Sequence, residues 1–151
     1  MSRLCLLVAL LTLSSPELRA QEYGIDDLAA AFGQAVIVIE ANEHACHKFD
    51  VFIAESMEQQ RRGLMFVRDL PQQSGMLFIY ADAGIHSMWM KNTFIPLDIA
   101  FIRRDGRISS VARHTEPLSL RSIRSTEPVN FVLELNAGVT DRLFIGPESL
   151  V

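Results

Sequence analysis

The sequence predicts a mainly β, single-domain protein, either a β-sandwich or a small partly open barrel, with one short capped helix. Three observations lead to this fold class. Strand-length apolar runs alternate with turn residues along most of the chain. An Asp-Gly pair, Asp105-Gly106, separates two of these runs as a tight hairpin turn does. The 151 residues, less an N-terminal export segment, suit one domain with its own core.

The N-terminus has the three parts of a secretory signal in order. Arg3 gives the positive start, residues 4–13 form an apolar run too short to span a bilayer, and Ala20 is a small residue before a cut. We therefore expect residues 1–20 to be a signal peptide cleaved near Ala20, and the mature protein to be periplasmic or secreted. An uncleaved N-terminal anchor is the alternative, because Leu18 and Arg19 are unusual at a cleavage site.

Residues 21–47 are expected to be an N-terminal segment that contains the first strand, and residues 48–151 the main β-domain. Within the first part, a short helix is expected near residues 26–32 and a β-branched strand over 35–39. The next strand, 49–54, carries apolar residues at both odd and even positions, which predicts burial on both faces.

One helix has clear boundaries. Ser56 and Gln59 have the spacing of a capping box, in which each side chain bonds to the backbone of the other. Gly63 then provides a backbone that can end the helix with a positive φ. The sequence therefore predicts a two-turn helix over 57–62.

The remaining elements are expected to be strands. They are residues 76–80, 85–90, 97–102, 108–113, 129–135 and 142–145. Between the last strands, residues 114–128 hold Pro117 and Pro128 and predict a long loop. Seven or eight short strands in total favour a sandwich or barrel.

Charge and cysteine content exclude some classes of function. The formal net charge of −4 argues against a nucleic-acid partner, and no apolar run beyond the signal is long enough for a membrane span. The arginines between residues 103 and 124 predict a solvated loop face, although they could also bind an anion. Cys46 is the single cysteine of the mature chain, so we expect no intramolecular disulfide and a buried or unreactive thiol.

The segment around the single tryptophan is the densest in candidate ligand-binding residues. Lys91, Asn92 and Thr93 form a polar triplet just after Trp89. A turn explains them, because Asn tolerates left-handed geometry and Thr bonds to nearby backbone. Alternatively, Lys91, Asn92 and Asp98 line a cleft beside Trp89 and bind a polar small molecule.

Two acids stand among apolar neighbours in expected strands. Asp98 lies between Leu97 and Ile99, and Glu134 between Leu133 and Leu135. Each could be a paired structural group or part of a ligand site. If both opened into one cleft, they could instead serve as the acid and base of a hydrolase, for example on a glycan.

Metal binding is a further alternative. His44, Cys46 and His47 are metal-ligand types, but on an extended strand His47 faces away from the other two. The five mature methionines could bind copper, although core filling explains them better. They are Met57, Met65, Met76, Met88 and Met90. No complete zinc, phosphate-loop or dinucleotide motif occurs, so no cofactor is expected.

The order of motifs resembles the family of uncharacterised proteins named domain of unknown function 192 (DUF192), over roughly residues 48–147. The most specific block is Trp89-Met90-Lys91-Asn92-Thr93. The other blocks are Gly63-Leu64-Met65-Phe66, Gly75-Met76-Leu77-Phe78, residues 95–101 and residues 132–138. Met88 departs from the pattern, since an aromatic residue is common there. The resemblance implies a β-sandwich-like domain, often behind a signal peptide, with no established activity.

The sequence therefore leads to three functional hypotheses. The first is an exported, non-enzymatic module that binds a small polar ligand or a partner protein through Trp89, Lys91, Asn92, Thr93, Asp98 and Glu134. The second is a hydrolase that uses Asp98 and Glu134. The third is a metal or copper binder.

Overall fold

A mixed six-stranded sheet forms the frame of the protein in the computed structural model, which describes residues 24–42 and 45–151. The strands in spatial order are β1 (Gly33–Asn42), β2 (Ala45–Ala54), β3 (Ser74–Gly84), β8 (Val129–Asn136), β5 (Leu97–Ile102) and β6 (Ile108–Ala112). Only β2 and β3 among these neighbours are parallel. A separate antiparallel pair joins β4 (Ser87–Met88) to β7 (Ile123–Arg124). The described chain is thus mainly β and forms no closed barrel.

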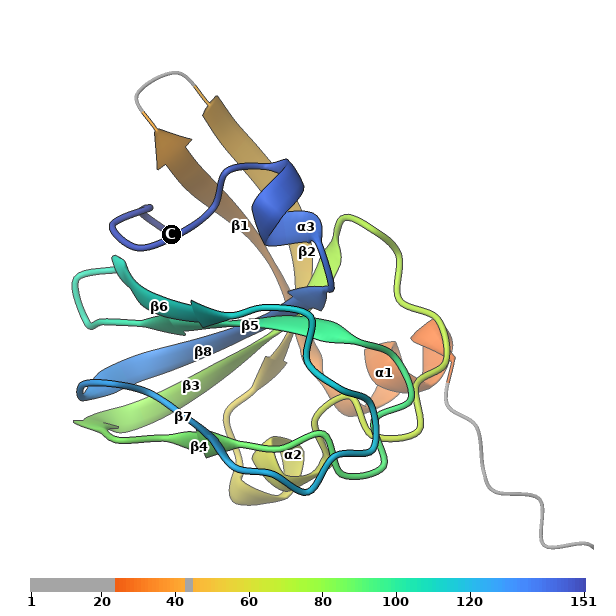
Figure 1. Ribbon diagram of the computed structural model, residues 1–151. Coiled ribbons are helices and arrows are strands. Elements are labelled where there is room, and N and C mark those ends of the chain that lie inside the picture. Colours follow the sequence, from red (N-terminus) through yellow and green to blue (C-terminus); the bar gives the residue numbers. More distant parts are fainter. Residues whose placement is uncertain (1–23, 43–44) are drawn as a thin grey trace, which may run out of the picture.

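The central strands are buried on both faces, so the sheet separates two apolar clusters. The first cluster includes Phe78, Ile99 and Val132, and it also contains Leu28 of α1 (Ile25–Ala31). The second includes Ala100 and Leu133 and extends to Val139 of α3 (Val139–Arg142). In Figure 1, α1, α2 (Met57–Arg62) and the β4–β7 pair lie on one side of the central strands, and α3 lies on the other.

The locally encoded elements are confirmed. Ser56 Oγ accepts a bond from Gln59 N at 3.2 Å, while Gln59 Oε1 accepts one from Ser56 N at 3.1 Å. The helix ends at Gly63, whose φ is 47°. The hairpin between β5 and β6 turns at Gly106, with φ of 85°. The expected short helix near 26–32 is α1, and β2 is buried on both faces through Val51 and Phe52.

Other elements differ from the expectation. A strand over 142–145 is wrong, because left-handed Gly138 (φ 79°) starts α3 there and Ile145 N bonds back to Thr140 O. The expected strand 85–90 is reduced to β4, and the expected loop 114–128 contains the short strand β7. The parallel pairing of β2 and β3 arises because α2 and the segment after it carry the chain back across the sheet.

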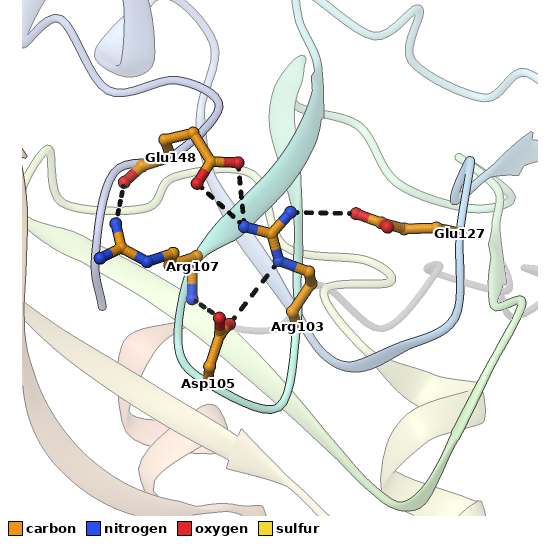
Figure 2. Close-up of polar contacts among 5 residues, drawn as sticks. All are labelled: Arg103, Asp105, Arg107, Glu127 and Glu148. Carbon is orange, nitrogen blue, oxygen red and sulfur yellow. Dashed lines mark hydrogen bonds and ion pairs between the residues drawn. The ribbon is translucent and has the colours of Figure 1, made fainter.

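Arg103 ties three distant segments together (Figure 2). Its guanidinium contacts Glu148 at 2.9 Å, Glu127 at 3.3 Å and Asp105 at 3.6 Å. Arg113 similarly pairs with Asp141 at 2.7 Å. These two arginines are therefore engaged by acids of the protein itself.

Candidate functional site

The Lys91–Thr93 triplet forms a turn. Thr93 N donates to Met90 O at 3.1 Å, and Asn92 has φ of 55°, which asparagine tolerates better than most residues. Asn92 O accepts from Phe66 N at 2.8 Å, so the turn anchors the segment after α2. The loop that contains Leu118 is also fixed to this turn, because Leu118 N donates to Thr93 O at 3.1 Å. The triplet thus positions the two loops that flank Trp89.

Asp98 is buried and fully used as a structural acceptor. Its Oδ1 accepts from His114 N at 2.9 Å, and its Oδ2 accepts from Thr140 Oγ1 at 2.7 Å and Thr140 N at 3.0 Å. Burial by itself raises the pKa of Asp98, but these bonds and one from the Gly138 backbone outweigh it and lower the pKa. Asp98 therefore holds the start of α3 against the sheet.

Glu134 is also buried, but it faces the other side of the sheet. It stands opposite Ile99 in β5, and Ile99 and Val132 share its face and belong to the first cluster. Asp98 precedes Ile99 and so projects from the opposite face. The shared cleft that the hydrolase alternative requires for Asp98 and Glu134 is therefore not formed.

Oε2 of Glu134 has no hydrogen-bond partner among the described residues, although the side chain is only 4% exposed. Burial raises the pKa of Glu134 to about 8, so the group is mainly a neutral acid at pH 7. The nearby charge of ionised Glu134, together with the larger effect of burial, raises the pKa of Tyr80 to about 12. A buried acid with an unused oxygen is the most unusual feature of this face.

Glu134 lines a small cavity between α2, β3 and β4, which we call the Glu134 pocket. Its volume is ≈ 70 Å³. Polar groups reach it from several elements, and they include Gln60, Arg61, Tyr80, Ser87 and Thr93. Arg62 lies at the same wall, with its guanidinium 5.3 Å from the Phe32 ring centre.

Trp89 forms part of the pocket wall and is 48% exposed. Lys91 Nζ lies 5.0 Å from the centre of its ring, a cation–π distance. On the far side of Trp89 a second hollow, of ≈ 150 Å³, is lined by Ser87, Met88, Trp89, Leu120 and Ser122. We call this second hollow the Leu120 groove. The pocket and the groove thus share one wall.

The structure brings together only part of the expected ligand set. Trp89, Thr93 and Glu134 line one pocket, and Lys91 joins them through the Trp89 ring. Asn92 instead has its side-chain amide 3.9 Å from Met65 Sδ, and Asp98 lies on the other face of the sheet. Sequence reasoning missed Arg61 and Tyr80, since no local signal shows that α2 and β3 meet Glu134.

The candidate metal site is less well formed. Cys46 is exposed, so of the two expectations for its thiol, buried or unreactive, the first is wrong; His44 lies outside the described residues. Residues 24–42 and 45–151 contain no group of three or more metal-ligating His, Cys, Asp or Glu side chains. Met76, Met88 and Met90 belong to the first apolar cluster. None of the helices in that part of the chain is long and apolar enough to cross a bilayer.

The fold and the pocket define a mainly β protein with a mixed sheet and a buried acid at the edge of a small cavity. The chain belongs to the DUF192 family, described as uncharacterised, which matches residues 37–151. The resemblance found in the sequence is therefore confirmed, and the match also takes in most of β1.

Two solved structures are similar to this chain. One, from Sinorhizobium meliloti 1021, is described as a candidate transcription regulator; it is 36% identical, with a TM-score of 0.77, over 79% of this chain and 92% of that chain. The other, a protein of unknown function from Novosphingobium aromaticivorans DSM 12444, is 29% identical, with a TM-score of 0.73, over 85% of this chain and 98% of that chain. No curated protein matches.

Proposed function

We propose that this protein is an exported, non-enzymatic binding module whose ligand places a polar group in the Glu134 pocket. The unpartnered oxygen of Glu134 carries this proposal. A buried polar atom without a partner costs about 1–3 kcal/mol, so a ligand that bonds to it recovers stability that the empty protein lacks. The exposed Trp89 ring beside it provides a flat apolar contact for the rest of the ligand.

The placement of the acids supports binding rather than hydrolysis. A glycosidase needs two carboxyl groups on either side of the scissile bond. Here Asp98 faces the second apolar cluster, and both of its oxygens accept hydrogen bonds from His114 and Thr140. Glu134 would have to act without it.

The proposal of export rests on Arg3, the apolar run 4–13 and Ala20, which lie outside the described residues. N-terminal sequencing of the protein recovered from the periplasm or medium of its native cells tests it. We expect the mature chain to begin at Gln21. Recovery only from the cytoplasm, with an intact N-terminus, would contradict export.

Thermal unfolding of the 21–151 chain in the presence of a panel of polar periplasmic metabolites tests binding. A ligand should raise the melting temperature by mass action. The rise should shrink in Trp89→Ala, which removes a pocket wall, and persist in the control Glu116→Gln, an exposed residue outside the pocket. No rise with any metabolite would overturn the small-ligand proposal and favour a partner protein, for which exposed Trp89 and Leu120 offer apolar contacts.

A further inference from the structure

We propose that the ligand is a small organic acid whose carboxylate enters the Glu134 pocket and whose apolar part lies in the Leu120 groove. This inference rests on the proposed function and assigns a chemical class to its ligand. Three observations carry it: the hydrogen-bond donors in the pocket, the arginines at its wall and the groove that adjoins it at Ser87, Met88 and Trp89.

Several groups in the pocket can donate hydrogen bonds. Among the described residues, the hydroxyl of Tyr80 has only the weak acceptor Met88 Sδ, at 3.9 Å, as a partner. Ser87 and Arg61 are exposed residues of the wall. Glu134 is the only acid among the described residues that line the pocket. As a neutral acid it donates one O–H, so the group that satisfies this set best is an acceptor with several lone pairs.

Charge also favours a carboxylate over an ammonium group. With Glu134 neutral, the charged groups at the wall are the cations Arg61 and Arg62. An ammonium ligand would need Glu134 to ionise and would still lie near these two cations. The Trp89 ring, which could hold a cation, already has Lys91 Nζ at 5.0 Å. A carboxylate ligand does not require Glu134 to ionise.

The volume of the Glu134 pocket limits how much of the ligand it can hold. A cavity of ≈ 70 Å³ has room for roughly five waters, which suits a carboxylate and one or two carbons. The remainder must lie outside the pocket, and the Leu120 groove adjoins the pocket at Ser87, Met88 and Trp89. In this groove Trp89 is 48% and Leu120 70% exposed. An apolar group on a short stem fits this arrangement.

Four probes test the chemistry by calorimetry and by NMR shifts at pH 7. Three are of matched size, namely 3-phenylpropionate, 3-phenylpropan-1-ol and 3-phenylpropan-1-amine, and the fourth, propionate, lacks the phenyl group. We expect 3-phenylpropionate to bind at least about tenfold more tightly than the alcohol and the amine, because only it pairs with Arg61 and the neutral Glu134. Propionate should bind about tenfold more weakly than 3-phenylpropionate, because it leaves the groove empty.

Exposed-residue variants separate the two parts of the site. Arg61→Gln should weaken both acids and leave the alcohol unchanged. Trp89→Ala should weaken 3-phenylpropionate and leave propionate nearly unchanged. Both side chains are solvent-exposed, so folding should be preserved. If Trp89→Ala weakens the two acids equally, the groove is not part of the site.

A pH series tests the role of Glu134. As Glu134 ionises, from pH 7 to pH 9, the wild type should lose about tenfold in affinity for 3-phenylpropionate, whereas Glu134→Gln should not. Two titratable neighbours lie outside this range: Tyr80 has a pKa raised to about 12, and His86 has a pKa lowered mainly by burial.

The outcomes distinguish this inference from the proposed function. If the alcohol or the amine binds more tightly than the acid, and Trp89→Ala weakens that binding, the inference of an organic-acid ligand is wrong but the proposal of a ligand-binding pocket stands. The same conclusion follows if the metabolite panel yields ligands of the pocket and none of them is an acid. If neither the panel nor the four probes bind, both proposals fall.

Discussion

At the scale of single residues, Asp98 and Glu134 show how one sheet treats two buried acids differently. Asp98 accepts three hydrogen bonds from His114 and Thr140, and these stabilise its charged form. Glu134 is buried and its Oε2 has no hydrogen-bond partner among the described residues, so its neutral form is favoured. The same substitution of carboxyl by amide should therefore have opposite consequences at the two positions.

Glu134→Gln should remove a pH-dependent loss of stability. The folded-state pKa of about 8 lies above the ordinary glutamate value of 4.5, so the wild type loses stability as the pH rises from 4.5 to 8. The loss amounts to roughly 3 to 6 kcal/mol. In urea unfolding, the variant should match the wild type at pH 5 and be more stable at pH 9. A constant difference across this range would mean that Glu134 is already ionised in the folded protein.

Asp98→Asn should destabilise the protein by about 3 kcal/mol at pH 7, because the amide nitrogen faces donors that the carboxylate accepts from. The pKa of Asp98 is lowered below 3.8, so its contribution is present above that pH and disappears as the pH falls through the folded value. Urea unfolding should thus show a difference from wild type that shrinks below pH 4. Equal stability at pH 7 would contradict the role assigned to Asp98.

At the scale of elements, the side chain of Gln59 holds α2 in place through three hydrogen bonds. The Gln59 side chain accepts from Ser56 N and Glu55 N and donates to Ala31 O at 3.0 Å, so it joins α2 to the end of α1. Ser56→Ala removes one capping bond and should cost about 1 kcal/mol. Gln59→Ala removes three bonds and should cost more. Urea unfolding measures both, with exposed Glu58→Gln as the control, and a smaller loss for Gln59→Ala than for Ser56→Ala would contradict this ranking.

Elements with local signals could be predicted from the sequence. The bounds of α2 follow from Ser56, Gln59 and Gly63, and the β5–β6 hairpin follows from Asp105-Gly106. The error at 142–145 has a non-local cause, because α3 is held by bonds from Thr140 to Asp98, which is 42 residues away in the chain. No short-range pattern encodes that contact.

The candidate site could be predicted in part for the same reason. Trp89 and Thr93 stand out in the segment around the single tryptophan, and Glu134 stands out as an acid in an apolar strand; the three share a pocket. That Asp98 and Glu134 lie on opposite faces could not be predicted without the register of β5 against β8. In this register Ile99, and not Asp98, stands opposite Glu134. Arg61 and Tyr80 join the site through the packing of α2 and β3 alone.

At the scale of the whole molecule, the C-terminal segment closes the second face of the sheet. Leu150 exchanges backbone hydrogen bonds with Glu40 of β1, at 2.7 Å and 3.0 Å. Glu148, two residues earlier, is held by Arg103 at the start of the β5–β6 turn. Arg103 also reaches Glu127, which precedes β8. One side chain therefore connects the chain end to the turn and to the loop before the central strand.

Arg103→Gln should lower the melting temperature, and the loss should be larger at low salt than in about 1 M NaCl, because salt screens partly exposed ion pairs. The neighbouring exposed Arg104→Gln is the matched control for the lost charge, and it should have little effect. Glu148→Gln should give part of the Arg103→Gln loss, and the double variant should lose less than the two singles together, because the two residues share one contact. Calorimetric scans of the four proteins at both salt concentrations measure this coupling. Equal losses for Arg103→Gln and Arg104→Gln would show that net charge alone, and not the contacts of Arg103, sets the effect.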